Sequence, residues 1–494
     1  MKILFIAPAS GKWQKVAGSK LFNGRTFRFS MLSLLTVAAE TPPDAEVQIV
    51  DEQIDDIPWD VDVDLVCITC MTAVAPRAYE IASRFLSKGI PVVLGGMHPT
   101  LCPEEAILHA TAIVVGEAEG IWPRVVYDAL NSKLKGIYRN KTPHPLKGLK
   151  RPPQNLLDID RYATVHAIQA TRGCPHGCDF CSVSVFSGKT QRQRPVNEVI
   201  DEVKRIPDRF VMFVDDNLTA NQDYARRLFN ALKPLNKYWV SQATLGIADD
   251  PEFVHLIADS GCIGLFVGLE TFSEKNLNDV NKSCHRVEQY QNAIQLLHSY
   301  GIGIEAGIVF GFDGDTPEVF SNTLDIIDRL EIDEIQVSVF TPLPGTPAFK
   351  RMKDRIFDKD WTHYDFHNVV FQPKRMSVEQ LKAGHDWVTH QFYRPWRIAR
   401  RVWRHAKRPK GMSTIFYHLA LNMAYYGRVT RWGIRGYDPD TRTNSTSNKA
   451  PIAVLIKSKN QEAAYRLEST VFKSSGSKIV ANNKKEVLAD AITS

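Results

Sequence analysis

Three cysteines within eight residues are the part of this sequence best suited to chemistry. Cys174, Cys178 and Cys181 have the spacing C-x3-C-x2-C. Thiolates on one short loop can ligate three irons of a [4Fe–4S] cluster, and the fourth iron then has no protein ligand. An iron with an open coordination position can bind a small molecule directly. The spacing therefore predicts a catalytic iron–sulfur cluster.

A structural zinc site is the alternative for these cysteines. Structural zinc usually has four protein ligands, and the only nearby candidate for a fourth is His176, so the cluster is favoured. The other five cysteines are Cys67, Cys70, Cys102, Cys262 and Cys284. We expect these to be packing residues in a reducing compartment, and alternation along a strand puts the first two on opposite faces.

Six short apolar segments separated by helical stretches carry the cysteine loop. This alternation predicts an α/β fold: a partial (β/α)6 TIM-type barrel over residues 166–354, with its site at the carboxyl ends of the strands. The cysteine loop directly follows the first segment. The expected strands are residues 167–170, 210–214, 239–242, 264–268, 303–310 and 334–340.

The cysteine loop, with Phe180 before its last cysteine, resembles that of the radical S-adenosylmethionine (SAM) enzymes. In that family the open iron binds the amino and carboxylate groups of SAM and reduces its sulfonium to give a 5′-deoxyadenosyl radical. The protein positions the cofactor and excludes water. The resemblance implies further SAM contacts at strand ends, from Asp215, Asp216, Gln242, Glu270, Gly307, Val309 and Gly311.

These positions also have structural interpretations. An acidic residue after a strand, such as Asp216, often only caps the next helix. Glu270 lies among Val, Gly and Leu, where a buried carboxylate needs a partner, and this favours a functional role. The sequence departs from the family pattern after Gly311, where Gly314 replaces an acidic residue and Asp315 is adjacent.

A second α/β pattern precedes the barrel, over residues 1–145. Its strands are apolar on both faces and alternate with helical segments, which is typical of a parallel, Rossmann-like sheet. The expected strands are residues 3–7, 47–50, 64–69, 91–94 and 112–115. Residues 146–165 include adjacent prolines and mixed charge without periodicity, and we expect a linker there.

Glycine-containing loops follow the last two of these strands, at the edge where parallel sheets bind ligands. Residues 95–100 and 116–120 resemble loops of the cobalamin-binding domain that precedes the barrel in cobalamin-dependent radical SAM enzymes. The resemblance implies cobalamin contacts from these loops and from the loop after the third strand, through Thr69, Thr72, Gly95, Gly96, His98, Thr100, Gly116 and Glu117.

The sequence has no Asp-x-His-x-x-Gly motif, which supplies the lower cobalt ligand in the methionine-synthase type of site. We therefore expect a displaced dimethylbenzimidazole tail, no histidine on cobalt and easier reduction to Co(I). His98 is more typical of a hydrogen-bonding histidine than of a ligand.

Charge is distributed unevenly along the chain. Hydrophobic residues make up 44% and charged residues 23% of the 494, which is typical of a folded enzyme. The net charge is +6, yet residues 394–435 contain nine Arg, two Lys and no acidic residue, so the remainder is at −5. An anionic partner would bind this segment. No apolar run approaches the ~20 residues that cross a bilayer, and we expect a cytoplasmic protein.

Residues 355–436 predict a helical, basic and aromatic extension, and residues 437–494 a poorly ordered tail. Residues 392–408 have the periodicity of an amphipathic helix with Pro395 in its first turn. Its apolar stripe is Phe392, Trp396, Ala399, Trp403 and Ala406. Its basic arc is Arg397, Arg400, Arg401, Arg404, Lys407 and Arg408.

This helix has two interpretations of equal weight. In the first, it lies at the headgroups of an anionic membrane, on the inner face. In the second, it packs its tryptophans on the barrel and exposes its charges to water. An RNA-binding face is less favoured because no recognition module accompanies it.

The two resemblances imply a cobalamin-dependent radical SAM enzyme. The leading hypothesis is a C-methyltransferase, in which one SAM methylates Co(I) and a second yields the radical that activates an unactivated carbon of an apolar or lipid-like substrate. A rearrangement or oxidative cyclisation, as in the anaerobic magnesium-protoporphyrin cyclases, is the alternative with the same cofactors. The implied partners are a small-molecule substrate, an electron donor such as flavodoxin or ferredoxin, and no nucleic acid.

Two other hypotheses rank lower. A methylthiotransferase acting on RNA carries an additional cluster on three N-terminal cysteines, but Cys67, Cys70 and Cys102 do not have the broad separations of those ligands. A non-enzymatic protein built on a retired barrel would have lost cluster residues, and all three cysteines of the loop are present.

Overall fold

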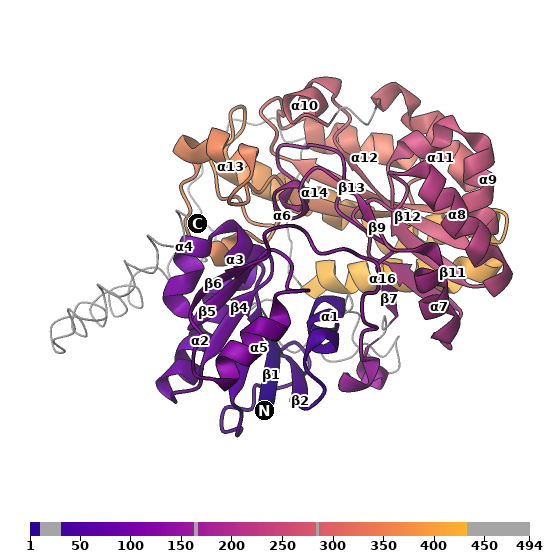
Figure 1. The fold of residues 1–494 in the computed structure, drawn as a ribbon. Coiled ribbons are helices and arrows are strands. Elements are labelled where there is room, and N and C mark those ends of the chain that lie inside the picture. The colour runs from indigo at the N-terminus through magenta and orange to yellow at the C-terminus, as the bar shows by residue number, and fades with distance from the viewer. Residues whose placement is uncertain (10–30, 163–165, 283–285, 432–494) are drawn as a thin grey trace. The chain divides into compact units, whose positions relative to one another are not determined.

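The computed structural model describes residues 1–9, 31–162, 166–282 and 286–431 (Figure 1). Two six-stranded parallel sheets follow one another along this part of the chain, each covered by helices. The predicted α/β class is therefore confirmed. Cys284 and the expected tail of residues 437–494 lie outside the described residues.

The first sheet has the strand order β2-β1-β3-β4-β5-β6. Its strands are β1 Lys2–Ala7, β2 Glu46–Asp51, β3 Leu65–Thr69, β4 Val92–Gly95, β5 Ala112–Val115 and β6 Gly136–Arg139. Its helices are α1 Leu32–Glu40, α2 Ala75–Ser87, α3 Met97–Leu101, α4 Pro103–Ala106 and α5 Trp122–Leu130. The sequence pattern did not predict β6, whose four residues include only one that is buried.

Hydrophobic residues fill both faces of this sheet, as the apolar strands predicted. One core joins α1 and α5 to the face that carries Cys67, and the other joins α2 to the face that carries Cys70. The two cysteines are thus separate packing residues and not a redox pair, and burial raises the pKa of both thiols.

The second sheet has the order β14-β13-β12-β11-β10-β7, so each strand pairs with the next long one in the sequence. Its strands are β7 Ala167–Ile168, β10 Phe210–Phe213, β11 Tyr238–Gln242, β12 Cys262–Glu270, β13 Gly303–Phe310 and β14 Glu334–Val339. Its helices are α7 Val196–Arg205, α8 Gln222–Leu232, α9 Pro251–Asp259, α11 Tyr290–Ser299, α12 Val319–Arg329 and α14 Val378–Phe392. All six predicted barrel strands are present.

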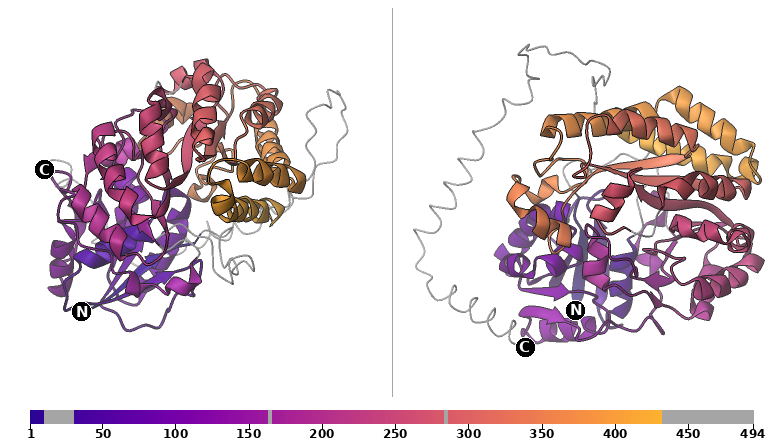
Figure 2. Two further views of the ribbon diagram at one scale, coloured as in Figure 1. Left: turned by 90° about the vertical axis from the view of Figure 1, so that its right-hand side faces the viewer. Right: turned by 90° about the horizontal axis from the view of Figure 1, so that it is seen from above.

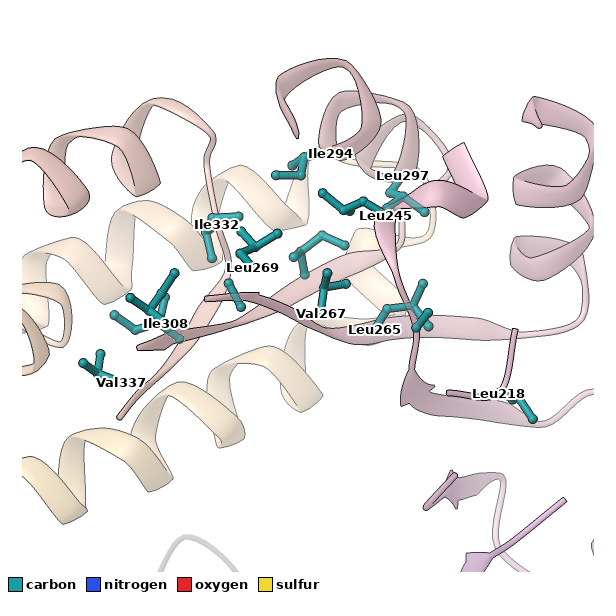
Figure 3. Close-up of a cluster of buried hydrophobic side chains, with 14 of the residues drawn as sticks. Leu218, Leu245, Leu265, Val267, Leu269, Ile294, Leu297, Ile308, Ile332 and Val337 are labelled. Carbon is teal, nitrogen blue, oxygen red and sulfur yellow. The ribbon is translucent and has the colours of Figure 1, made fainter. Parts of the chain in front are cut away.

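Alternation along β12 shows how this sheet separates its core from its site. Val267 and Leu269 are fully buried and pack near Ile294 and Leu297 of α11 (Figure 3). Phe266, the residue before Val267, points to the opposite face, where it lines a cavity. The helices therefore cover one face, and the other is left for a ligand.

Short elements connect the strand ends. They are the antiparallel pair β8 Thr171–Arg172 and β9 Arg192–Gln193, with α6 Ser182–Ser187, α10 Glu274–Asp279 and α13 Pro347–Met352. The expected extension forms α14 together with α15 Pro395–Ala406 and α16 Gly411–Arg431, which lie together beside the barrel (Figure 2). No helix in the described residues is long and apolar enough to cross a bilayer.

The orientation of α15 corrects the sequence analysis. Both interpretations turned the arginines outward, but most of them face the barrel. Arg397 and Arg400 lie 2.5 and 3.1 Å from carboxylate oxygens of Asp328, and Arg408 lies 2.7 Å from Asp333. Arg404 lies 3.4 Å from Glu331. Trp396 and Trp403 are instead exposed, and Phe392 belongs to α14. The barrel's acidic residues, invisible in a local pattern, decide which face turns inward.

Candidate active site

A cavity of about 1020 Å³ separates the inner face of the barrel sheet from the carboxyl edge of the N-terminal sheet. One wall is formed by alternate residues of the barrel strands, such as Met212 of β10, Phe266 of β12 and Gln336 of β14. The facing wall comes from the loops after β3, β4 and β5 and from α1, and α16 contributes a third wall. The predicted site residues on these walls are Thr69, Gly95, Gly96, Gly116, Glu117, Asp216 and Gln242.

The cysteine loop lies between β8 and α6 and is held by distant segments. Asp179 donates its N–H to the Val280 carbonyl, 3.0 Å away, and accepts from the N–H of Ala348 at 3.0 Å. The Asn281 side chain donates to the Gly177 carbonyl, also at 3.0 Å. The positions of the three cysteines are therefore fixed by the barrel, because the loop backbone has partners on both sides.

The environment of the thiols suits a metal cluster. Burial raises the pKa of Cys174 and Cys181, while backbone N–H groups stabilise the Cys181 thiolate and Lys282 favours that of Cys174. A bound metal deprotonates such thiols, and N–H donors then stabilise the sulfur charge. Cys178 is buried beside them, and Phe180 packs edge-on against Phe340. The three thiols fit a [4Fe–4S] cluster with one iron left open.

The acidic pair after β10 divides into two roles. Asp215 is fully buried and accepts hydrogen bonds from the N–H groups of Ala170 and Thr171 and from the Thr171 hydroxyl. It therefore holds the strand that leads into the cysteine loop and does not face the cavity, contrary to the contact that the resemblance implied. Burial raises its pKa to about 7.

Asp216 is the member of the pair that faces the cavity. Its carboxylate accepts the Gly173 N–H at 2.8 Å, directly before Cys174, and also lines the cavity wall. Burial raises its pKa. Asp216 and the exposed Gln242 at the end of β11 are therefore the predicted SAM contacts that the structure brings to the cavity.

Glu270 ends β12 in an unusual backbone conformation. Its φ is +65°, a region that non-glycine residues rarely adopt, and the strand register shifts there. Its buried carboxylate forms an ion pair with Lys282, which also lies 5.9 Å from the centre of the Phe180 ring. The partner that the burial of Glu270 required is thus this lysine. Lys282 could not be predicted, because nothing in the sequence around it distinguishes it from a surface lysine.

The segment after β13 is shaped by packing. A Cβ on Gly307 would lie 3.0 Å from the Phe266 ring, and one on Gly311, whose φ is +104°, would lie 2.9 Å from Leu381. Asp315 accepts the N–H groups of Gly311 and Phe312 at 2.9 and 3.0 Å, so this neighbouring acid holds the loop. Among the described residues, the cavity wall does not include Gly307, Val309 or Gly311.

The N-terminal loops offer bare backbone to the cavity. Gly96 has a φ of +97°, and a Cβ there would lie 3.1 Å from both the Cys70 nitrogen and Thr69 Oγ1. A Cβ on Gly116 would instead meet open space, and one on Gly95 would contact only the Val114 Cβ, at 4.0 Å. Thr100 joins the two loops, because its hydroxyl donates to the Gly96 carbonyl and accepts the Gly116 N–H. Such a cradle without side chains fits a broad ligand such as cobalamin.

His98 is buried away from this cradle. One ring nitrogen lies 3.4 Å from the Thr72 hydroxyl and the other 2.9 Å from the Tyr79 hydroxyl. Cys102 and Glu105 lie close by, but Glu105 is bonded to Tyr79 and Trp361, and burial raises the pKa of Cys102 to about 12. The group is a hydrogen-bonded packing network, and it supplies no ligand to the cavity.

Glu117 links the N-terminal sheet to the β8–β9 pair that flanks the cysteine loop. Arg172 lies 3.4 Å from Glu117 and 2.8 Å from Glu119, and Arg192 also pairs with Glu117. These side chains are largely buried, and although burial opposes ionisation of Glu119, Arg172 holds its pKa below the ordinary value. The glycine loop after β5 is thereby fixed to the strand that leads into the cysteine loop.

The buried Glu270–Lys282 pair generates a stability prediction. Lys282→Met leaves the Glu270 carboxylate buried without its cationic partner, and we expect a loss of ~3–5 kcal/mol in the free energy of unfolding. Adding Glu270→Gln should recover most of the loss. Chemical denaturation measures both, with the nearby exposed Lys275→Met as the matched control. If Lys282→Met and Lys275→Met were equally stable, the pair would have no structural role.

Comparisons with known proteins agree with this geometry. The family model of the B12 binding domain matches residues 37–126, and that of the radical SAM superfamily matches residues 168–327. Bacteriochlorophyllide d C-12(1)-methyltransferase of Chlorobaculum tepidum is 32% identical over 75% of this chain and 84% of its own. Hopanoid C-2 methylase of Rhodopseudomonas palustris is 27% identical over 65% of this chain and 63% of its own.

A solved structure has the same fold. The radical SAM methyltransferase TsrM from Kitasatospora setae, with cobalamin and a [4Fe–4S] cluster bound, has a TM-score of 0.60 and 15% identity over 88% of this chain and 100% of its own. The predicted fold and cofactor set, a [4Fe–4S] cluster, SAM and cobalamin, are confirmed. The chain belongs to the cobalamin-binding radical SAM enzymes.

Proposed function

We propose that this enzyme is a C-methyltransferase that acts on an unactivated carbon of a large, mainly apolar small molecule. The single observation that carries the proposal is the shared cavity, which meets the glycine loops on one wall and the Asp216 side of the cysteine loop on another. Methyl transfer to a carbon radical requires the methyl donor and the radical source to reach the same substrate atom.

In this proposal, the barrel side of the cavity binds the cluster and SAM, and the N-terminal loops bind cobalamin. When bound, cobalamin supplies the methyl group, and the cluster with SAM supplies the radical. Cys174, Cys178 and Cys181 would hold the cluster, and Asp216 and Gln242 would contact SAM. Backbone at Gly95, Gly96 and Gly116 would support the corrin, whose lower face would meet the loop that follows Thr69.

The cavity wall itself supports an apolar substrate. Phe210, Met212, Val240 and Phe266 line its barrel side. Polar groups gather at one end, where Gln336 donates to Glu305 at 2.9 Å and to the Tyr425 hydroxyl at 2.7 Å. A polycyclic body with one polar substituent suits this distribution, as do the tetrapyrrole and hopanoid substrates named for the two relatives.

The electrons come from outside the chain in this proposal. Reduction of the cluster and of cobalt needs a one-electron donor, for which flavodoxin and ferredoxin are the chemically suited proteins. The compartment would be the reducing cytoplasm, in line with the absence of a disulfide among the seven described cysteines.

Labelled SAM tests the proposed reaction. Reconstituted enzyme is incubated with CD3-labelled SAM, a strong reductant and either a bacteriochlorophyllide or a hopanoid precursor. The proposal predicts 5′-deoxyadenosine together with a product that carries one CD3 group in place of hydrogen. Formation of 5′-deoxyadenosine with an altered but unlabelled product would contradict methylation and favour rearrangement or cyclisation.

Removal of one cluster ligand is the first prediction from this proposal. Cys178→Ala should lower the iron content of the anaerobically reconstituted protein from about four atoms, and 5′-deoxyadenosine should no longer form. Cys102→Ala removes a half-buried thiol between α3 and α4 of the N-terminal domain and should leave both the iron content and 5′-deoxyadenosine formation unchanged. Full activity in the Cys178 variant would contradict the assignment of the cluster.

Filling the glycine cradle is the second prediction. Gly95 faces the cavity, its φ is not left-handed, and a Cβ there meets only Val114 at 4.0 Å. Gly95→Leu should therefore fold normally, hold its iron and lose corrinoid binding in an equilibrium titration. Gly246→Leu, which adds the same side chain at an exposed site outside the cavity wall, is the control. Corrinoid binding retained by the Gly95 variant would refute the assigned wall.

The cobalt ligand gives the third prediction. The N-terminal wall of the cavity includes no histidine among the described residues, and His98 is bonded elsewhere. The electron paramagnetic resonance spectrum of the Co(II) form should therefore show no nitrogen hyperfine coupling from a protein imidazole. A coupling that disappears in His98→Ala would contradict the prediction.

A further inference from the structure

The outer surface of α15 and α16 forms an apolar groove of about 500 Å³. Both helices line it, through Pro395, Ile398, Ala399, Val402, Trp403, Ala406, Ile415, Leu419, Met423 and Tyr426. Large side chains stand at its edges: Trp396 is 54% exposed, Trp403 59%, Met412 70% and Phe416 79%. Trp396 and Trp403 are the exposed tryptophans of the described chain. Monomeric proteins rarely leave such a group of side chains in water.

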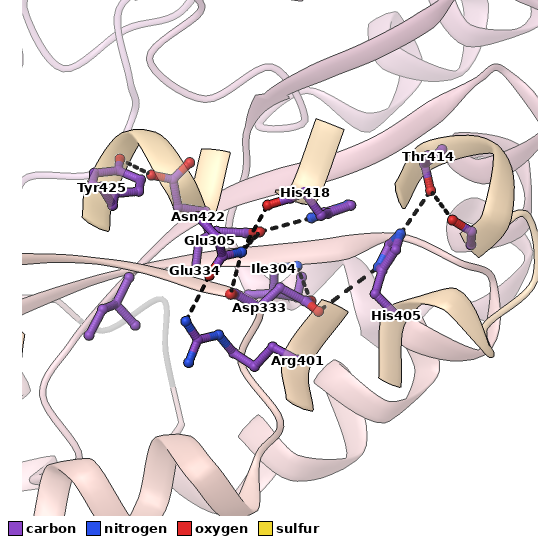
Figure 4. Close-up of polar contacts among 12 residues, drawn as sticks. Ile304, Glu305, Asp333, Glu334, Arg401, His405, Thr414, His418, Asn422 and Tyr425 are labelled. Atoms are coloured by element: carbon purple, nitrogen blue, oxygen red, sulfur yellow. Dashed lines mark hydrogen bonds and ion pairs between the residues drawn. The ribbon is translucent and has the colours of Figure 1, made fainter. Parts of the chain in front are cut away.

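The direction of the arginines explains why this surface is apolar. Arg397, Arg400, Arg404 and Arg408 are paired with carboxylates of the barrel, as described above. Arg401 is buried and donates to the Phe392 carbonyl and to Asn422. Figure 4 shows Arg401 and His405 directed inward at the network around Asp333 and Glu334. The charged face thus anchors the hairpin, and the opposite face is presented outward.

The remaining charge at the edge of the groove is positive. Arg394 and Lys407 are exposed, and within the described residues neither of them is paired with a carboxylate. Lys407 lies 3.3 Å from the centre of the Trp403 ring. Aromatic rings with lysines beside them suit the headgroup boundary of a bilayer, where the ring is partly buried and the ammonium meets lipid phosphate. The absence of acidic residues from positions 394–435 favours an anionic surface.

One helix joins this surface to the catalytic cavity. Tyr417, Leu421 and Tyr425 of α16 line the cavity, while Ile415, Leu419 and Met423 of the same helix line the groove. The cavity is therefore separated from the outer groove by the thickness of α16. Docking at the groove would therefore bring a lipid-like substrate in the bilayer next to the α16 wall of the cavity.

We propose that the α15–α16 hairpin is a membrane-docking surface that inserts Trp396, Trp403, Met412 and Phe416 into the headgroup region of an anionic bilayer and brings the α16 wall of the cavity to that surface. Binding is driven by the aromatic edge, and the inward arginines contribute little. The entry route of the substrate rests on the proposed function, whereas the docking itself does not.

Vesicle flotation of the full-length protein tests the docking without turnover. Wild-type protein should float with phosphatidylcholine vesicles that contain about a third phosphatidylglycerol. The triple variant Trp396→Ala, Trp403→Ala and Phe416→Ala should lose at least ~100-fold in partitioning, because three partly buried rings are removed. Tyr127→Ala with Phe357→Ala, at 62% and 55% exposed sites elsewhere, is the matched control and should float normally.

Reversing the charge at the edge of the groove is a second, independent test of the docking. Arg394→Glu with Lys407→Glu should weaken binding to the anionic vesicles, and thermal unfolding midpoints should confirm that every variant is folded. Failure of the wild type to float at low salt, or equal flotation of the triple variant, would overturn the proposal. A solution dimer that the triple variant dissociates would assign the groove to a second copy of the chain and also overturn it.

Discussion

Buried ion pairs between the N-terminal domain and the two short strands around the cysteine loop are the interaction on which the site depends. Arg172 and Arg192 come from the short strands that flank the cysteine loop, and Glu117 and Glu119 come from the glycine loop after β5. Buried ion pairs add little net stability, because desolvation offsets their attraction. They form only when the two side chains are well aligned for hydrogen bonding. Their value here is orientation, since they fix the glycine loop on one wall of the cavity relative to the strands that flank the cysteine loop.

The rest of the site follows from parallel strands. Every strand of both sheets ends at a carboxyl edge, and both edges contribute loops to one cavity. Alternation puts helices on one face of the barrel sheet and leaves the other face for a ligand. Asp215 and Asp315 then use their carboxylates to hold the loops that follow β7 and β13. Buried polar residues at the strand ends therefore include residues that hydrogen-bond the loop backbone and do not contact a cofactor.

The sequence predicted those features that depend on local spacing. Three cysteines at short intervals, apolar strands with period two and paired glycines at strand ends are each readable within a few residues, and the strands were found where they were expected. Features that depend on distant partners were not readable. The ion pairs of Lys282 with Glu270, of Arg172 with Glu119 and of Arg397 with Asp328 join residues that are 12, 53 and 69 positions apart, beyond the reach of a local pattern. The same limit explains Asp215, whose donors lie 44 and 45 positions away.

The central claim is that the cobalamin and radical sites share one cavity in a fixed arrangement. Electron paramagnetic resonance relaxation measures this directly in protein that holds both Co(II) cobalamin and the reduced cluster. The shared cavity predicts that the reduced cluster accelerates relaxation of the Co(II) signal, and that Arg172→Gln with Arg192→Gln weakens the effect. Co(II) relaxation that is the same with and without the reduced cluster would place the two cofactors too far apart to act on one substrate and would contradict the claim.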